Sequence, residues 1–201
     1  MIDIPNFVPG AQSKDVLRGE QNKLNVIHIP HSSLRNQKEN QTMIKGLHHS
    51  AYRCRDSEET RKFYEDFLGL KLVGTLAIKD NPRAPKSDVL HTFFQMDDGS
   101  CLAFFEALDM PFDFKRQLDF DLHIALEVDE PALLTMFAKG KERGIETRGI
   151  TDHGMVHSIY FRDPNGYVVE LTAKMPAHDE AMNPATNRAR EILDQWQAAK
   201  G

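Results

Sequence analysis

Apolar and polar positions alternate along two stretches of this chain, and both stretches follow the same order of elements. The first alternation, GLHHSAYRC, begins at Gly46, and a helix then follows at residues 57–68, where Asp56 offers a cap and Gly69 an end. Three more alternating runs complete the first set and predict strands at residues 70–78, 89–96 and 101–107.

The same order then returns in the second half of the chain. FDLHIALEV predicts a strand, and a helix follows from Pro131 to Arg143, with proline in its first turn. Strands are expected at residues 145–148, 156–161 and 167–173. Two consecutive βαβββ modules explain this order better than a single open sheet, and the fold class is α+β.

Two flanking segments lie outside the repeat. Residues 1–42 are polar, and we interpret them as an arm on the surface or on a partner subunit, the alternatives being disorder and an engineered leader. A C-terminal amphipathic helix is expected from Met182 to Ala199, with Pro184 at its start, packed on the core or on a second subunit. The predicted parts are an arm at 1–42, modules at 43–110 and 111–176, and the C-terminal helix at 177–201.

Composition and charge indicate which binding partners and which cellular compartment to expect. The formal charge is −5, which gives no reason to expect nucleic acid or an anionic membrane as partner. The two cysteines, Cys54 and Cys101, have no C-x-x-C spacing, which argues against a disulfide scaffold and a thiolate zinc site. The N-terminus does not resemble a signal peptide, and no run of about 18 apolar residues occurs. A soluble cytoplasmic protein is the expectation.

Matching points of the two modules carry candidate metal ligands. The first strand of the first module holds His48 and His49, of which strand alternation allows only one to point inward, and the first strand of the second module holds His123. Glu170 lies in the last strand, four positions after Gly166. Two imidazoles and one carboxylate form the open metal site that is typical of non-haem Fe(II) oxygenases.

The position equivalent to Glu170 in the first module is an alanine. Counting four positions from Gly99 gives Ala103, so a symmetric pair of modules would supply four ligands and this chain supplies three. The free positions leave room for water, dioxygen or a bidentate substrate. Glu106 lies three residues beyond Ala103 and hence on the other face of the strand, so we reject it as a ligand.

Three segments of the repeat resemble a known superfamily. HHSAYRCRDSEETRKFYEDFLGLKL, LHIALEV and YFRDPNGYVVEL are similar to the vicinal oxygen chelate superfamily, which includes glyoxalases, bleomycin-resistance proteins and extradiol dioxygenases. The resemblance covers residues 46–175 and implies paired modules forming a cupped mixed sheet around a metal. It also implies that the ligands are His49, seven residues before Asp56, together with His123 and Glu170, and that the chain forms a homodimer.

A second resemblance concerns the last hairpin. The stretch TDHGMVHSIYFRDPNGYVVE is similar to the ring-cleavage dioxygenase signature, which implies that His153 and Tyr160 lie beside the substrate. Two registers stay open. A four-residue loop at 163–166 puts His157 on the face of Glu170, and a five-residue loop puts Tyr160 there.

The dioxygenase pattern is not complete in this chain. Ser100 and Cys101 occupy the place of a proton-transferring histidine, for which His91 on the preceding strand is the substitute we consider. An additional pair of modules, common in extradiol enzymes, is missing. Glyoxalase I and methylmalonyl-CoA epimerase use a fourth ligand, and Ala103 argues against both. Fosfomycin-modifying relatives share the three-ligand pattern but need a cationic pocket, and near Glu170 the sequence offers only Arg162 and Lys174.

The sequence therefore predicts a metalloenzyme that binds Fe(II), or alternatively Mn(II), through His49, His123 and Glu170. Its substrate chelates the metal through two neighbouring oxygens, and a catechol-like diol is the first expectation. The alternatives are a glyoxalase-like lyase or isomerase, a thiol transferase, and a metal-free binding or resistance protein. Four phenylalanines either line an aromatic pocket or belong to the core, namely Phe93, Phe94, Phe104 and Phe105.

Overall fold

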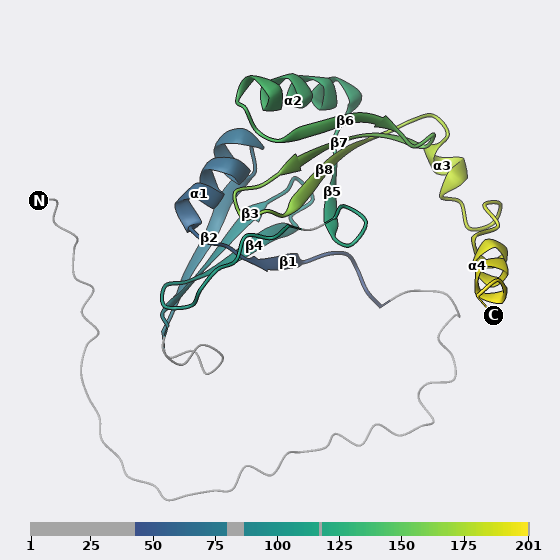
Figure 1. Cartoon of the computed structure of the whole chain (residues 1–201). Coiled ribbons are helices and arrows are strands. Elements are labelled where there is room, and N and C mark those ends of the chain that lie inside the picture. The colour runs from purple at the N-terminus through teal and green to yellow at the C-terminus, as the bar shows by residue number, and fades with distance from the viewer. Residues whose placement is uncertain (1–42, 80–86, 117, 201) are drawn as a thin grey trace, which may run out of the picture. The chain divides into compact units, whose positions relative to one another are not determined.

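The computed structural model describes residues 43–79, 87–116 and 118–200, and the predicted arm at 1–42 lies outside them. The chain divides into two compact units, Met1–Lys45 and Gly46–Gly201, and all the helices and strands described below belong to the second unit (Figure 1). Within it the predicted pair of βαβββ modules is confirmed.

The first module is a four-stranded mixed sheet with one helical segment. Its sheet order is β1-β4-β3-β2, with β1 parallel to β4 and the other pairs antiparallel. The elements are β1 (His49–Arg53), α1 (Ser57–Arg61), which continues as the π-helix η2 (Lys62–Phe67), β2 (Lys71–Ile78), β3 (Val89–Gln95) and β4 (Cys101–Ala107).

The second module repeats this arrangement. Its sheet order is β5-β8-β7-β6, and β5 is parallel to β8. The elements are β5 (His123–Glu127), α2 (Glu130–Glu142), β6 (Thr147–Asp152), β7 (Val156–Arg162) and β8 (Val168–Lys174). Helix α2 covers one face of this sheet, over β6, β7 and β8 (Figure 1).

Helix α1 begins where the sequence predicts a cap. The carboxylate of Asp56 accepts a hydrogen bond from the backbone N–H of Glu59 at 2.7 Å, which satisfies a free donor of the first helical turn. Glu106, rejected above as a metal ligand, accepts from the backbone N–H of Ser57 at 2.8 Å. It therefore supports the start of α1 on the core side of β4.

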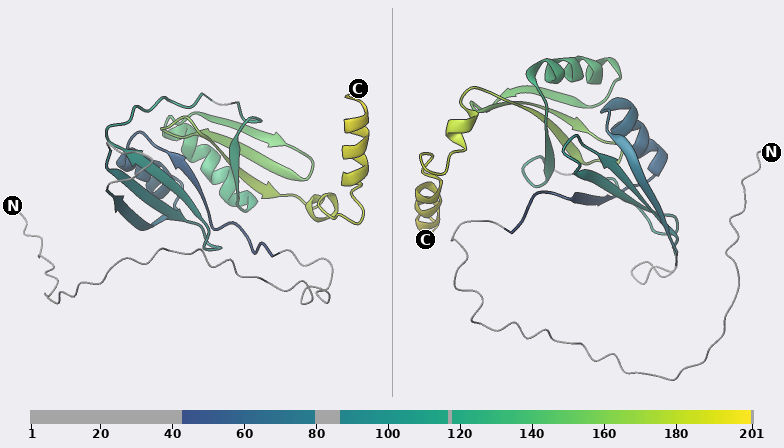
Figure 2. Two further views of the ribbon diagram at one scale, coloured as in Figure 1. Left: turned by 90° about the horizontal axis from the view of Figure 1, so that it is seen from below. Right: turned by 180° about the vertical axis from the view of Figure 1, so that it is seen from behind.

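The predicted start of the C-terminal helix is wrong. Helix α3 (His178–Ala181) is followed by a loop, and α4 (Ala189–Ala198) begins five residues after Pro184 (Figure 2). The side chains of Asn183 and Asn187 accept hydrogen bonds from backbone N–H groups two residues ahead, both at 3.0 Å. Such local bonds compete with helix formation and explain the loop.

Helix α4 does not pack on the core. Its apolar residues are exposed, with Ile192 at 57%, Leu193 at 48% and Trp196 at 65%. Of the two placements expected for this helix, packing on the core is therefore wrong, and packing on a second subunit stays a prediction. No described helix has the length and apolar character needed to cross a membrane.

One apolar core joins the two modules. It contains side chains from η2, from the strands of both sheets and from α2, and its fully buried members include Tyr64, Phe94, Leu102, Phe104, Leu133, Ile159, Phe161 and Val169. Phe94 and Phe104 thus belong to the core. Phe93 and Phe105 alternate with them and lie on the opposite face of the same strands.

A buried turn between β7 and β8 contacts the start of α1. The side-chain oxygen of Asn165 accepts from the backbone N–H of Arg55 at 2.8 Å, and its amide donates to the hydroxyl of Thr60 at 3.2 Å. The hydroxyl of Tyr64 donates to the carboxylate of Asp163 at 3.1 Å. Burial raises the pKa of Asp163. Polar side chains of one module are therefore satisfied by the other.

Candidate metal site

Two of the three candidate ligands meet on the sheet of the second module. His123 begins β5 and Glu170 lies in the middle of β8, where it is opposite Ala125. Because His123 and Ala125 are two residues apart, both face the same side as Glu170. The Nε2 atom of His123 is 3.1 Å from a carboxylate oxygen of Glu170, which is 7% exposed.

The other ring nitrogen of His123 determines what this contact means. Its Nδ1 contacts the backbone carbonyl of Asp119, which accepts only from an N–H, so Nδ1 carries the proton. In the neutral ring, Nε2 is then an acceptor, and it faces the carboxylate of Glu170, which is also an acceptor. Only a cation placed between them, a proton or a metal ion, makes this arrangement favourable.

The spacing of the two atoms fits a shared metal. Ligand nitrogen and oxygen atoms lie about 2.1 Å from a divalent ion. Two neighbouring ligands of an octahedral ion are therefore about 3 Å apart. His123 and Glu170 thus have the donor chemistry and the separation of two ligands of one ion.

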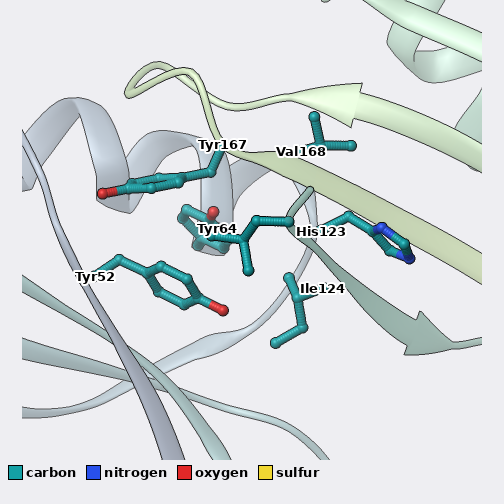
Figure 3. A pocket seen from close by; sticks show the side chains of 7 residues that line it. Tyr52, Tyr64, His123, Ile124, Tyr167 and Val168 are labelled. Atoms are coloured by element: carbon teal, nitrogen blue, oxygen red, sulfur yellow. The ribbon is translucent and has the colours of Figure 1, made fainter. Parts of the chain in front are cut away.

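The imidazole of His123 points away from a small internal cavity (Figure 3). That cavity, of about 10 Å³, lies on the other side of the backbone and is lined by Tyr52, Tyr64 and Tyr167, among others. A space of this size holds at most one water molecule. It therefore cannot take a substrate, and any substrate of this site would approach from the exposed face of the sheet.

The register of the last hairpin answers the question that the sequence left open. Tyr160 is opposite Glu170 and Arg162 is opposite Val168, so residues 163–167 form a five-residue loop. Tyr160, not His157, shares the face of Glu170.

Tyr160 is also close to His153. Its hydroxyl oxygen is 3.0 Å from Nε2 of His153. Burial, and next the negative charge of Glu170, raise the pKa of Tyr160, so the phenol stays protonated at neutral pH. The hydroxyl is therefore a hydrogen-bond donor beside the carboxylate.

His49 lies on the sheet of the first module, beside two other rings. It is exposed, its Nδ1 is 2.8 Å from Nδ1 of His48, and its ring centroid is 5.7 Å from that of Phe93 and 6.3 Å from that of His91. Ala103 shares this face, because it is opposite Ala51 in the register. A side chain at the position of a fourth ligand would thus point toward the same space as His49.

His91 is buried on this face. Its Nδ1 is 3.0 Å from the carbonyl oxygen of Phe104, which fixes the proton on Nδ1 and leaves Nε2 as an acceptor. Its ring stacks on that of Phe105, with centroids 3.6 Å apart. His91 therefore has a fixed ring orientation. It lies beside Phe93 and Phe105, on the face of the first sheet that points away from the core.

A single chain does not bring His49 together with the other two ligands. Among residues 43–79, 87–116 and 118–200, no group of three or more His, Cys, Asp or Glu side chains is placed to hold a metal ion. The physical reason is the shared core. Phe94 and Phe104 in one module, and Val169 and Leu171 in the other, point into it, so the alternating faces with His49 and Glu170 both point away from it.

Sequence reasoning missed two charged residues near Glu170. Arg148 of β6 is opposite Tyr160, its guanidinium lies 5.1 Å from the centre of the Tyr160 ring, and it forms an ion pair with Asp119. The two cations expected from the sequence are likewise paired, Arg162 with Glu146 and Lys174 with Glu127. No local pattern distinguishes Arg148 from other surface arginines, because its role depends on the register of β6 and β7.

Solved structures with the same fold include two fosfomycin resistance proteins and a glyoxalase/dioxygenase. A mutant of FosX from Listeria monocytogenes, complexed with Mn(II) and 1S,2S-dihydroxypropylphosphonic acid, is 20% identical, with 69% of this chain and 99% of that chain covered and a TM-score of 0.53. A glyoxalase/dioxygenase from Nostoc punctiforme is 22% identical, over 70% and 98% of the chains, with a TM-score of 0.52. FosX from Mesorhizobium loti is 21% identical, over 69% and 99%, with a TM-score of 0.50.

The comparison with curated proteins found no match. The family model described as "Glyoxalase/Bleomycin resistance protein/Dioxygenase superfamily" matches residues 46–171, which is more than half of the chain and spans both modules. The predicted superfamily is thereby confirmed, and its members are often metal-dependent enzymes. The chain belongs to the glyoxalase/bleomycin resistance protein/dioxygenase superfamily.

Proposed function

We propose that this protein is a divalent-metal enzyme whose substrate chelates the metal through two neighbouring oxygens. The observation that carries the proposal is the contact of His123 Nε2 with the Glu170 carboxylate at 3.1 Å, with Nδ1 held by the Asp119 carbonyl. Two acceptors converge there and only a cation satisfies both. The superfamily membership supports the choice of a metal ion over a proton.

We propose further that His49 of a second copy completes the site. Within one chain the ligand-bearing faces of the two modules both point away from the shared core, so they are free to face another molecule. Exposed apolar side chains flank both ligand strands, namely Leu47 at 55%, Phe120 at 84% and Leu122 at 41%. Exposed apolar side chains next to a functional face favour a protein partner. In a symmetric homodimer, His49 of each chain would complete the metal site of the other chain.

The reaction we propose first is Fe(II)-dependent ring cleavage of a catechol-like diol. When bound, the metal would act as a Lewis acid that lowers the pKa of the diol. Tyr160 and His153 would donate to and accept from the oxygens of the substrate, since their polar atoms are 3.0 Å apart beside Glu170. Phe93 and Phe105 would pack against the apolar part of the substrate.

A second candidate function is favoured by Arg148. Its guanidinium beside Tyr160, which pairs with Asp119, is a cation that the sequence did not reveal, and guanidinium groups bind phosphonate and carboxylate oxygens well. An anionic substrate would bind there by competing with Asp119. The Listeria FosX structure contains Mn(II) and a phosphonic acid with two hydroxyl groups. We therefore keep a Mn(II)-dependent activity on a small anionic substrate as the alternative.

One experiment separates the two. The full chain is purified without oxygen, its bound metal is measured, and it is loaded with Fe(II) or with Mn(II). Oxygen uptake with a panel of catechols in the Fe(II) form, together with a coloured ring-fission product, would support the dioxygenase. Conversion of fosfomycin in the Mn(II) form without oxygen uptake would support the alternative. Failure to bind either metal would overturn the proposal as a whole.

Tyr160→Phe gives a prediction specific to the substrate side of the site. Removing the hydroxyl takes away a protonated donor beside Glu170 but no ligand atom, so we expect turnover to fall at least about tenfold while metal content is unchanged. Metal analysis and steady-state rates on the same preparation would show this. An unchanged rate would mean that Tyr160 only fills space.

A further inference from the structure

A turn just before β5 holds the residue that fixes His123. The turn at residues 118–122 bonds mainly to itself, with the N–H of Asp121 donating to the carbonyl of Leu118 at 3.0 Å. Its apolar side chains are exposed, as Leu118 at 57% and Phe120 at 84% show. Asp119 is its partly buried member. The turn therefore needs a link to the sheet to keep one position.

Asp119 makes two contacts with different groups. Its backbone carbonyl accepts the Nδ1–H of His123, and its side-chain carboxylate pairs with the guanidinium of Arg148. The first contact decides which nitrogen of His123 is free to bind a metal. The second ties the turn to β6, the strand at the opposite edge of the sheet from β5.

Arg148 reaches Asp119 by crossing over Tyr160. It is opposite Tyr160 in the β6–β7 register, and its guanidinium lies 5.1 Å from the centre of that ring. The aromatic face thus restrains the cation that holds the carboxylate. Arg148 on β6, Tyr160 on β7 and Glu170 on β8 are neighbours in the register, and the ion pair with Asp119 extends this row to the turn before β5.

We propose that the Asp119–Arg148 ion pair is a positioning device for the metal site: it holds the turn so that the Asp119 carbonyl accepts the Nδ1–H of His123 and the ring keeps Nε2 directed at Glu170. The inference rests on the proposed function for its effect on metal binding. Its effect on the His123 ring exists without any metal. Exposed ion pairs contribute little to stability, so breaking this one should change the ring and leave the fold intact.

Two variants of the full chain test the device, Arg148→Gln and Asp119→Asn. Glu127→Gln is the matched control, because it breaks the Lys174–Glu127 pair on the same sheet, whose atoms are 2.8 Å apart. The first measurement is ¹H–¹⁵N NMR of the His123 ring in metal-free protein, where Nδ1–H donates to the Asp119 carbonyl. We expect a hydrogen-bonded, slowly exchanging Nδ1–H in the wild type and in the control, and rapid exchange of this proton with water in the two variants.

The second measurement is Mn(II) affinity by electron paramagnetic resonance. We expect about tenfold weaker binding in both variants and no change in the control. The double variant Asp119→Arg with Arg148→Asp restores the pair in reverse and should recover both readouts in large part. An unchanged Nδ1–H exchange rate and unchanged affinity in Arg148→Gln would overturn the inference. Wild-type protein that binds no Mn(II) or Fe(II) would overturn the proposed function, and the exchange rate of Nδ1–H alone would then decide the inference.

Discussion

Replacing Glu170 by Gln should remove tight metal binding from this protein without unfolding it. Gln keeps the shape of the side chain but loses the negative charge, so His123 Nε2 no longer faces an anionic partner for a shared cation. Since outer-shell changes alone cost about 10- to 100-fold in metal affinity, we expect the loss of a ligand to cost at least about a hundredfold. Titration with Mn(II) or Fe(II) measures it, and thermal unfolding of the metal-free protein checks the fold.

Mixing two inactive chains extends this prediction to the second copy. Glu170→Gln and His49→Ala should each destroy both sites of a homodimer. Consider a heterodimer with one chain of each kind and sites that combine Glu170 of one chain with His49 of the other. One of its two sites then carries both substitutions, and the other site carries neither. We expect that heterodimer, purified with two different tags, to bind one metal ion per dimer. Recovery of none would mean that His49 and Glu170 act from the same chain.

Replacing Gly166 by Ala should cause a large loss of stability. Its φ of +95° is a conformation that side chains with a Cβ rarely adopt, and an added Cβ would lie 2.2 Å from the backbone oxygen of Lys115. The backbone cannot retreat cheaply, because the N–H of Lys115 donates to the carbonyl of Asn165 at 2.8 Å. We expect the free energy of unfolding to fall by about 3 kcal/mol or more in urea denaturation.

Gly99 provides the control for this substitution. It occupies the equivalent turn of the first module with a φ of +85°, but nothing lies within 4 Å of the place that an added Cβ would take. Gly99→Ala therefore carries only the conformational cost, about 1–2 kcal/mol. Equal losses for the two variants would show that the contact with Lys115 is unimportant and that the loop at 163–167 can shift at little cost.

The order of elements was predictable because both modules encode it locally. Strand alternation, the cap at Asp56 and the proline in the first turn of α2 are short-range signals, and they place the helices and strands to within a few residues. His123 and Glu170 were candidates because of their places in the repeated modules, and the structure brings them to 3.1 Å of each other. The start of α4 was missed, because the side chains of Asn183 and Asn187 make local bonds that periodicity does not reveal.

The rest of the site depends on distances between strands. Tyr160 reaches the face of Glu170 only because the loop has five residues, with the N–H of Asp163 donating to the carbonyl of Tyr167 at 2.9 Å. Arg148 meets Asp119 only because the sheet brings residues 29 positions apart into contact. The separation of His49 from the other ligands follows from the packing of both modules on one core, which strand patterns do not specify.

The exposed position of Trp196 in helix α4 determines what the fluorescence of this protein reports. Trp196 is the only tryptophan of the chain, and it is 65% exposed. Indole fluorescence shifts to shorter wavelength when water is removed from the ring, and the core that joins the modules contains no indole. The emission of this protein should therefore change little when the core unfolds, and should follow instead the binding of whatever molecule covers α4.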